Sequence, residues 1–387
     1  GRHLRRLFLR HLGASPVAVA QTRRILFAKQ LLHETHLPMT HVALAAGFGS
    51  VRRFNEAFQQ LFQRPPTSLR CARVATPQGI GVVESGITVR LRYRPPYDWR
   101  AMLDHLRMRA VDGIERVDAD SYRRTVLQDG RVGTVEVCHV ASGNSLEARI
   151  RMPSVRDLSR VVARVRHVFD LGADVVTIGS HLAQDSLLAP LVAARPGLRA
   201  PGGWDGFELA VRAVLGQQVS VEAARQLAGH LARLCGTPAR LEQKMSYGLT
   251  VAFPTADQVV AADLTSLGMP GARRKTLQAI AAAALADPFL FQPRAGMEQT
   301  LARLRAIPGV GDWTAQYIAL RAVREPDAFP SSDLGLQRSL AEESGRRPTP
   351  AELRSRAECW RPWRAYAAQH LWTADAARPC ARRKERS

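Results

Sequence analysis

Within the stretch Leu304–Leu340, a glycine hairpin is followed 22 residues after its second glycine by the carboxylate of Asp333 at an expected helix start. The hairpin, Pro308–Gly311, places two glycines around one apolar residue, and glycines can take positive φ and bring bare backbone close to a ligand. We expect Asp312 to cap the helix that follows, so that the first N–H groups of this helix face outward beside the hairpin. Backbone donors at a helix N-terminus suit a phosphate group, and they bind it without reading a base sequence.

The carboxylate, Asp333, ends a loop and directly precedes a new apolar-periodic run. This position predicts an acidic side chain at a helix start that faces the hairpin. Asp is a common helix N-cap, so the residue taken alone fits a structural role as well as a catalytic one. Trp313 and Tyr317 lie four residues apart and share one face of the expected helix. Aromatic residues at this spacing are usually core, but they also form pockets for planar or cationic ligands.

The composition indicates a negatively charged partner. The chain has 387 residues, enough for two to four domains, and its net charge is +21. Arg supplies 51 of the 55 basic residues, which genomic base composition can explain in part. The sign of the charge nevertheless predicts binding to a polyanion, and nucleic acid is the commonest polyanion in a cell.

Two further features exclude other classes of protein. The chain has no run of about 18 apolar residues and no signal-peptide pattern, so we expect a soluble, cytoplasmic protein with no membrane contact. Its five cysteines are scattered without a Cys-x-x-Cys pair, which argues against structural zinc and against a disulfide framework. Separately from the cysteine spacing, we expect no cofactor, no metal and a monomer.

The first 78 residues hold 12 basic and 2 acidic side chains, so much of the positive charge lies there. Residues 38–58 predict a helix, a glycine turn and a second helix. On the second helix the apolar residues share one face, while Arg52, Arg53 and Asn55 point outward as DNA-contacting groups do. An ordinary amphipathic helix with a solvated face explains this window equally well. The chain opens without Met inside a helical pattern, so we expect this module to be incomplete at its front.

Alternating apolar residues predict an antiparallel sheet covered by helices in the next part of the chain. We expect one strand, a helix, three strands and a second helix, in that order. The expected strands are Ile87–Tyr93, Gly113–Thr125, Arg131–Val140 and Ser145–Met152, and the expected helices are Asp98–Val111 and Val155–Phe169. We find no catalytic constellation there, so this domain is expected to support one wall of a pocket. Helical patterns follow at Phe207–Leu215 and Val221–Leu234.

The hairpin and Asp333 together resemble the helix-hairpin-helix, Gly/Pro-rich, Asp motif of base-excision DNA glycosylases. The similarity extends over about Thr88–Ala377 and is closest to the AlkA-type 3-methyladenine DNA glycosylases. Several separate motifs in the family's order are a specific signal, which a lone hairpin is not. The supporting motifs are Tyr93–Trp99, Ala194–Leu198, Val214–Ser220 and Trp360–Tyr366.

The resemblance implies a role for each matching residue. Asp333 is then the catalytic carboxylate, and Gln218 fills the gap that a flipped nucleotide leaves in the duplex. The hairpin and the helix after it bind DNA through Gly309, Val310, Gly311, Asp312 and Thr314. The base pocket is lined by Trp313, Tyr317, Trp372, His105 and Met102. His105 stands where the family often has an aromatic residue, although a lone His is more often a packing or solvated residue.

The same resemblance implies the reaction. A base methylated at N3 or N7 carries positive charge, which attracts a π-face and weakens the glycosidic bond. One carboxylate can then suffice, whereas sugar hydrolases use two. Sister enzymes that also nick the strand carry a Lys two positions after the second hairpin glycine, and Trp313 stands there. We therefore expect a monofunctional glycosylase that removes alkylated purines, of the 3-methyladenine and 7-methylguanine type, from double-stranded DNA in the bacterial nucleoid.

Residues 1–78 resemble the paired helix-turn-helix domain of AraC-type activators. The end of the first unit and the linking helix are matched by His3–Phe8, Gly13, Pro16 and Ala28–Leu32, and the second unit by Ala43–Phe48, Ser50, Phe54, Phe58 and Pro66–Arg70. Gln63 departs from the pattern, because the family usually has Gly there. A module of this type joined to such a glycosylase resembles the Ada-related proteins of the alkylation response, so a promoter site is expected as a second DNA partner.

The expected fold is mainly α with one α+β domain. Two alternatives to the glycosylase remain open: a transcriptional activator of the alkylation response whose glycosylase half only binds DNA, and a non-enzymatic hairpin module as in ligases and helicases. Intact Asp333, Trp313 and Tyr317 disfavour both. The expected parts are a helix-turn-helix module (1–78), a linker (79–87), an α+β domain (88–175), a helical helix-hairpin-helix domain (176–378) and a basic tail (379–387).

Overall fold

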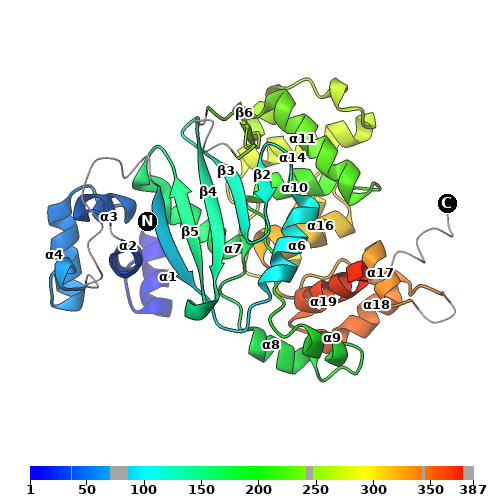
Figure 1. Ribbon diagram of the computed structural model, residues 1–387, viewed down its shortest axis with the longest axis horizontal. Coiled ribbons are helices and arrows are strands. Elements are labelled where there is room, and N and C mark those ends of the chain that lie inside the picture. Colours follow the sequence, from blue (N-terminus) through cyan, green and yellow to red (C-terminus); the bar gives the residue numbers. More distant parts are fainter. Residues whose placement is uncertain (36, 70–85, 241–246, 342–344, 378–387) are drawn as a thin grey trace.

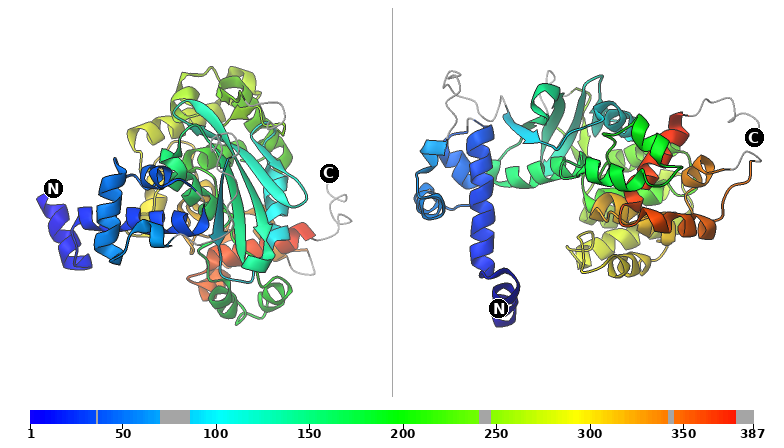
Figure 2. Two further views of the ribbon diagram at one scale, coloured as in Figure 1. Left: turned by 60° about the vertical axis from the view of Figure 1, so that its left-hand side comes forward. Right: turned by 90° about the horizontal axis from the view of Figure 1, so that it is seen from below.

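The computed structural model describes residues 1–35, 37–69, 86–240, 247–341 and 345–377. A small helical module lies at one end of the long axis, a sheet lies in the middle, and most of the remaining helices lie at the other end (Figure 1). The right-hand view of Figure 2, from below, shows the same order. The expected basic tail lies outside the described residues, as does the expected linker except for its last two residues.

The N-terminal module is helical, and serine side chains cap the starts of its two longest helices. Ser15 and Ser50 accept hydrogen bonds from the N–H groups of Ala18 and Arg53, at 3.2 and 3.3 Å. Gln63 ends the last long helix in a left-handed conformation (φ 55°), at the position where the resembled family usually has Gly. The elements are α1 (Arg2–Leu12), α2 (Pro16–Glu34), α3 (Met39–Ala45), α4 (Val51–Phe62) and the 3-10 helix η1 (Pro66–Leu69).

α3 and α4 form the predicted helix-turn-helix. Phe54 and Phe58 of α4 are fully buried against the rest of the module. Arg52, Arg53 and Asn55 are exposed on the opposite face of α4, as the apolar spacing predicts. This orientation follows from the 3.6-residue period, which separates the two faces of a helix.

Five antiparallel strands form the sheet in the order β1-β5-β4-β3-β2. They are β1 (Ile87–Arg92), β2 (Glu115–Val117), β3 (Ser121–Gln128), β4 (Arg131–Val140) and β5 (Ser145–Arg151). The prediction of one strand over Gly113–Thr125 is wrong, because this run contains all of β2 and the start of β3. The N–H of Asp118 donates to the carbonyl of Ser121 at 2.9 Å and closes a turn between them. Periodicity alone does not reveal so short a turn.

Both predicted helices of the sheet domain are present within two or three residues of their expected ends. Asp98 caps the first by accepting from the N–H of Ala101 at 2.9 Å. The second begins as a 3-10 turn and continues as an α-helix. The elements are α6 (Trp99–Arg109), η2 (Ala141–Gly143), η3 (Val155–Asp157) and α7 (Leu158–Val168).

The C-terminal half is helical apart from one short two-stranded ladder. Within the described ranges no helix combines the length and the hydropathy needed to cross a bilayer. The elements are α8 (Val175–Leu182), α9 (Ala189–Ala194), α10 (Gly206–Leu215), α11 (Val221–Cys235), β6 (Thr237–Pro238), β7 (Val251–Ala252), α13 (Ala256–Ala261), η4 (Thr265–Leu267), α14 (Gly271–Ala286), α15 (Met297–Arg305), α16 (Asp312–Ile318), the π-helix η5 (Ala319–Val323), α17 (Leu334–Ser339), α18 (Pro350–Arg356), η6 (Ala357–Trp360) and α19 (Arg364–Ala377).

The buried apolar residues that the structure describes form three clusters. The first runs without a break from the N-terminal module into the sheet. The second surrounds α10, α14 and α16, and the third joins α8 to α18 and α19. Trp372 of α19 packs against both the second and the third cluster. The boundary between these two clusters is therefore where α16 and α19 meet.

A buried ion-pair network joins the sheet to the helical half. Arg124 of β3 and Glu208 of α10 form an ion pair of 2.7 Å, and both residues are at most 4 % exposed. Arg212 pairs with Glu208 at 3.1 Å and with Glu115 at 2.9 Å. Burial raises the pKa of Glu115, but Arg212, Arg124 and a hydrogen bond from Tyr122 together bring it below its ordinary value. Each charged group of the network keeps its partners only while α10 and the sheet stay in this relative position.

We predict that Arg124→Met destabilises the chain by about 3 kcal/mol, because two carboxylates then share one buried cation. Urea unfolding followed by tryptophan fluorescence measures this, since Trp204 lies 4.5 Å from the guanidinium of Arg124. The exposed Arg131→Met is the control and should change the free energy of unfolding by less than about 0.5 kcal/mol.

The pH dependence has a definite sign. The pKa of Glu115 in the folded chain lies below its ordinary value of 4.5, so the ionised carboxylate stabilises the fold. This contribution to the free energy of unfolding is fully present above about pH 4.5 and is lost as the pH falls through the pKa of Glu115 in the folded chain. Equal free energies of unfolding for wild type and Arg124→Met at neutral pH would contradict the proposed contribution of the ion-pair network to stability.

Candidate active site

The hairpin between α15 and α16 requires glycine at the first of its two glycine positions, residue 309. Gly309 has a φ of 84°, and a Cβ atom there would collide with the side chain of Thr276 on α14. Gly311 is different, because a Cβ atom there would meet open space. The N–H groups of both glycines lack a partner within the described part of the chain. Two backbone donors are thus available beside the start of α16.

The expected N-cap is displaced by one residue. Gly311 is the N-cap of α16, and Asp312 is its first helical residue, without a side-chain capping bond. Asp312 is exposed and pairs with Arg305 at 2.5 Å. Glycine is a common N-cap residue, and the carboxylate of Asp312 pairs with Arg305 instead of binding the helix backbone.

The residues around the hairpin divide into exposed backbone and buried support. Val310 and Thr314 are only 5 % and 2 % exposed, so their side chains support the turn from inside. Thr314 was expected to contact DNA, but its hydroxyl accepts a hydrogen bond from Gln217 Nε2 at 3.0 Å. Gln217 also donates to the carbonyl of Gly309 at 3.3 Å. This side chain fixes the hairpin to the end of α10, and the sequence analysis did not single it out.

Gln218, the expected plug, is exposed in the turn between α10 and α11. Its φ of 56° is left-handed, which is uncommon for a residue other than glycine. Because Gln217 binds the hairpin, its neighbour lies on the same side of the molecule as the free N–H groups. The role of Gln218 as a plug stays a prediction.

Asp333 is both a helix cap and the centre of a cluster of donors. Its Oδ1 accepts from the N–H groups of Gly335 and Leu336 at 2.9 and 3.0 Å, which caps α17. Oδ1 also accepts from Trp372 Nε1 at 2.8 Å, and Oδ2 accepts from Trp313 Nε1 at 2.9 Å. The two indoles come from α19 and α16, so the carboxylate joins helices that are remote in the sequence. The acid predicted from its position therefore lies between the two predicted tryptophans.

The loop before Asp333 is held firmly. The N–H of Phe329 donates to Gln316 Oε1 on α16 at 3.0 Å, and Phe329 itself is 3 % exposed. Ser331 is buried and accepts from Arg354 at 3.2 Å. This loop therefore brings the carboxylate back onto the helix that carries Trp313.

The predicted aromatic residues form one group beside the carboxylate. The rings of Trp313 and Tyr317 are stacked, with centroids 5.2 Å apart and an interplanar angle of 11°. Trp372 meets Tyr317 edge to face at 6.5 Å. Rings stacked this closely leave no gap for a third ring between them, so a bound base must lie against an outer face or in the corner beside Trp372. All three side chains, like Asp333, are partly exposed.

Arg321 is an addition that the sequence analysis missed. It lies on the π-helix directly after α16 and is 2 % exposed, with its guanidinium 5.1 Å from the ring of Trp372 and 5.8 Å from that of Tyr317. It donates to Gln369 Oε1 and to the carbonyl of Pro201, both at 2.8 Å. Burial lowers its pKa to about 10. One cation is thus already bound to the aromatic walls, which weakens the expectation that these walls select a base by its positive charge.

The phenol of Tyr317 lies in a positive field. Burial raises its pKa, but Arg109, Arg321 and Arg212 outweigh burial and bring it below the ordinary value. His105 of α6 faces the same cations. Burial, then Arg109, Arg321 and Arg212, hold the pKa of His105 well below its ordinary value. His105, which faces the same arginines as Tyr317, is therefore neutral at pH 7. Arg109, one turn further along α6, is a second residue that the sequence did not reveal.

Met102 has a different environment from His105. It is 3 % exposed and belongs to the apolar cluster of the sheet domain. Its predicted contribution to the base pocket is thus indirect, through the packing of α6, and a direct contact with a base stays a prediction.

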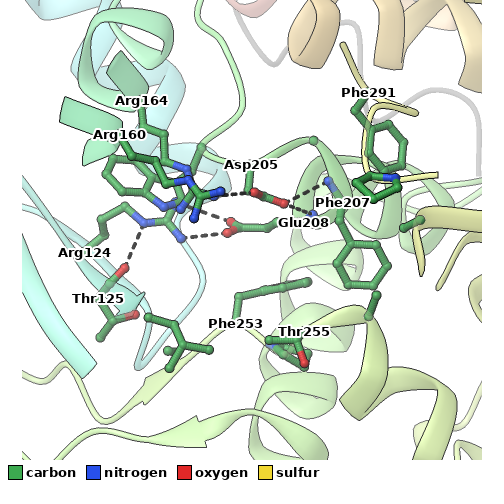
Figure 3. Close-up of a pocket in the computed structure, with 18 of the residues that line it drawn as sticks. Arg124, Thr125, Arg160, Arg164, Asp205, Phe207, Glu208, Phe253, Thr255 and Phe291 are labelled. Atoms are coloured by element: carbon green, nitrogen blue, oxygen red, sulfur yellow. Dashed lines mark hydrogen bonds and ion pairs between the residues drawn. The ribbon is translucent and has the colours of Figure 1, made fainter. Parts of the chain in front are cut away.

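A cavity of about 480 Å³ lies elsewhere, between the sheet and the start of α10 (Figure 3). Its walls include Trp204, Phe207, Phe253 and Phe291, and the ion pair of Arg124 with Glu208 closes one side. The described lining residues include none of those predicted for the site. The start of α10 borders this cavity and the end of α10 carries Gly216 and Gln217, so the helix separates the cavity from the hairpin. We do not assign it to the base.

Three family models match separate parts of the chain. Residues 1–72 match a helix-turn-helix domain, residues 88–205 match the AlkA N-terminal domain, and residues 211–365 match the HhH-GPD superfamily base excision DNA repair protein. The third match contains the hairpin, Asp333 and two of the three aromatic residues.

Comparison with individual proteins gives the same result. The chain is 37% identical to the "Probable bifunctional transcriptional activator/DNA repair enzyme AlkA" of Mycobacterium tuberculosis, over 96% of this chain and 74% of that protein. It is 36% identical to the DNA-3-methyladenine glycosylase 2 of Escherichia coli, over 75% of this chain and 98% of that protein. A solved structure, the 3-methyladenine DNA-glycosylase from Archaeoglobus fulgidus, shares the fold with a TM-score of 0.65 at 20% identity, covering 74% of this chain and 98% of its own. The chain belongs to the AlkA-type base excision DNA glycosylases of the HhH-GPD superfamily, with an AraC-type helix-turn-helix module in front of the glycosylase.

Proposed function

We propose that the chain hydrolyses the N-glycosidic bond of alkylated purines in double-stranded DNA and leaves an abasic site. The observation that carries the proposal is the carboxylate of Asp333, held between the indole N–H groups of Trp313 and Trp372 beside a hairpin with free backbone donors. The Escherichia coli relative, named as a DNA-3-methyladenine glycosylase, supports the choice of substrate.

The hydrogen bonds at Asp333 distinguish its two oxygens. Among the residues that the structure describes, Oδ1 accepts three N–H groups, whereas Oδ2 accepts only that of Trp313. Each carboxylate oxygen offers about two lone-pair positions, so Oδ1 is fully used and one position on Oδ2 remains. We assign to Oδ2 the contact with the reacting sugar and with water.

The reaction then follows from the position of Oδ2. A flipped nucleotide brings its C1′ atom to the carboxylate while the hairpin holds the neighbouring phosphate. As the bond from C1′ to the base nitrogen breaks, the negative charge stabilises the oxocarbenium-like sugar. A water molecule adds to C1′ and gives up a proton, for which the carboxylate is the nearest acceptor. The alkylated base leaves with the electron pair of the broken bond.

The strand is expected to stay intact. A lyase reaction needs an amine that forms a Schiff base with C1′. Trp313 occupies the position two residues after Gly311, where bifunctional relatives carry a Lys. A hydrolytic, monofunctional reaction is the one that this residue permits.

The helix-turn-helix module adds a second DNA-binding surface. Its support is the family match over residues 1–72 and the exposed polar face of α4, which carries Arg52, Arg53 and Asn55. The name of the Mycobacterium tuberculosis relative includes a transcriptional activator, so a promoter is the natural target for this face. An activator whose glycosylase half only binds DNA is the second candidate, and the catalytic residue separates the two.

We predict that Asp333→Asn lowers base release from methylated duplex DNA roughly a hundredfold or more, because Asn removes the negative charge. Asn keeps the helix cap through its carbonyl oxygen, but its NH2 group cannot accept from the Trp313 indole, so the free energy of unfolding should fall by less than it does for Asp333→Ala. Asp333→Ala also loses the cap and should unfold about 1 kcal/mol more easily. The assay follows released base and, in parallel, strand integrity. Equal base release by wild type and Asp333→Asn, or none by either, would remove Asp333 from the reaction.

We also predict that Arg52→Ala with Arg53→Ala weakens binding to undamaged duplex and reduces the slope of log K against log salt by about 1.8, or about 0.9 for each phosphate that is no longer neutralised. Fluorescence anisotropy in a Gly311→Asp background isolates the module, because the added carboxylate repels phosphate from the hairpin and its Cβ meets no neighbour. Arg131→Ala with Arg160→Ala is the control with the same charge change on other exposed residues. An unchanged salt slope would show that α4 does not contact DNA.

A further inference from the structure

The N-terminal module is docked onto the sheet domain. The buried residues of the module and of the sheet form one continuous apolar cluster. α2 contacts β1 at the edge of the sheet, and α3 contacts η3. His41 and Leu44 of α3 face Ile150 and Met152 across a small crevice of about 210 Å³. A flexible tether would not bury apolar side chains in this way, so the structure fixes the direction in which the module faces.

Charged groups support this docking. Glu34 at the end of α2 lies near Arg92 of β1 and Arg166 of α7. Burial raises the pKa of Glu34, while a hydrogen bond from Gln30 and the charges of the two arginines act in the opposite direction. Apolar burial and opposite charges therefore occur in the same interface.

The DNA-facing helix of the module points away from the glycosylase. The apolar face of α4, with Phe54 and Phe58, packs on the side of α2 and α3, and these two helices are the ones that contact the sheet. α4 consequently forms the outer layer of the module, and its polar face is directed to solvent. Figure 1 shows α4 at one end of the long axis, with α2 and α3 between it and the sheet.

The catalytic cluster lies beyond the opposite edge of the sheet. β1, the strand at the module, and β2, the strand next to α6, are the two edges. Five strands spaced about 4.8 Å apart span roughly 19 Å. One helix layer on each side adds about 10 Å more. α16, α17 and α19 lie on the far side of the sheet from α4 in Figure 1 and in the right-hand view of Figure 2.

We propose that one molecule bridges two separate segments of double-stranded DNA, one in the glycosylase site and one on the polar face of α4. This inference rests on the proposed function and adds a second duplex as the partner of the N-terminal surface. A single duplex does not fit both surfaces, because DNA is stiff over about 150 base pairs, the polar face of α4 is directed away from the sheet, and the catalytic cluster lies across the sheet from it. The DNA segment that the module holds is therefore not the segment that is repaired.

Bridging has a consequence for how the enzyme is placed on DNA. Binding of the module keeps the glycosylase near neighbouring DNA without occupying the duplex that it must open. Phosphate contacts are largely independent of base sequence, so the second segment need not carry damage.

The test is co-capture of two duplexes by the full chain. A biotinylated duplex with one methylated purine is attached to streptavidin beads and loaded with Asp333→Asn protein, which leaves the lesion in place. A fluorescent undamaged duplex is then added at roughly 0.15 M salt. We expect the fluorescent duplex to be retained in proportion to the bound protein. Adding Arg52→Glu and Arg53→Glu should reduce the retained fluorescence to the level of protein-free beads, and Gly311→Asp should release the protein from the biotinylated duplex.

The controls distinguish bridging by one molecule from a general charge effect and from dimerisation. Arg131→Glu with Arg160→Glu changes the charge equally on other exposed residues and should leave co-capture intact. Co-capture that survives the α4 substitutions would overturn the proposal, because a dimer with two glycosylase sites would then be the bridge. Absence of co-capture although the chain binds each duplex alone would also overturn it. Base release by the wild-type chain is measured separately, so that a failure of the proposed function is recognised independently of the bridging result.

Discussion

The carboxylate of Asp333 is held by N–H groups from three segments of the chain. Two belong to the start of its own helix, one to Trp313 on α16 and one to Trp372 on α19. α16 packs in the second apolar cluster, and α19 packs mainly in the third. The carboxylate therefore lies where two independently packed groups of helices meet. A shift of either group of helices would remove one indole donor. The packing of the C-terminal half therefore determines the position of the Asp333 carboxylate.

Positive charge is distributed in two different ways in this molecule. In the glycosylase half, Arg321 is buried behind the aromatic walls, and Arg109 of α6 and Arg212 of α10 also act on Tyr317. A cationic base that approaches these walls meets repulsion from behind and attraction from Asp333. We propose that the preference for a damaged base comes from the carboxylate and from the weakened glycosidic bond of that base, more than from the ring faces. In the N-terminal module the cations are exposed, where they are suited to phosphate.

The sequence was informative where function depends on local order. The hairpin, the position of Asp333 at a helix start and the exposed face of α4 follow from short-range spacing, and the structure has them where they were expected. Trp372 was reached only through the family resemblance, because no periodicity relates it to Trp313. Gln217 and Arg321 were missed, since a glutamine at a helix end and an arginine after a helix look ordinary until the chain is folded.

The errors have physical causes as well. The strand predicted over Gly113–Thr125 is two strands, because a short turn does not interrupt the alternation of apolar residues. The capping role expected of Asp312 passed to Gly311, since Arg305 pairs with the carboxylate of Asp312. The domain boundaries remain predictions, although the continuous apolar cluster shows that the N-terminal module and the sheet are not separate in packing.

The most direct measurement is the single-turnover rate of base release for Trp313→Phe, Trp372→Phe and the double variant. Phe keeps an aromatic ring but has no indole N–H, so each change removes one donor to Asp333 together with part of the packing of the larger ring, and the free energy of unfolding is measured in parallel. If these donors position the reacting carboxylate, each single variant should lose about tenfold in rate, since a hydrogen bond to a charged group contributes about 1.5–3 kcal/mol. The double variant should approach the rate of Asp333→Asn while it still binds DNA. A double variant with the wild-type rate would contradict the account, because the carboxylate would then act without the indoles that hold it.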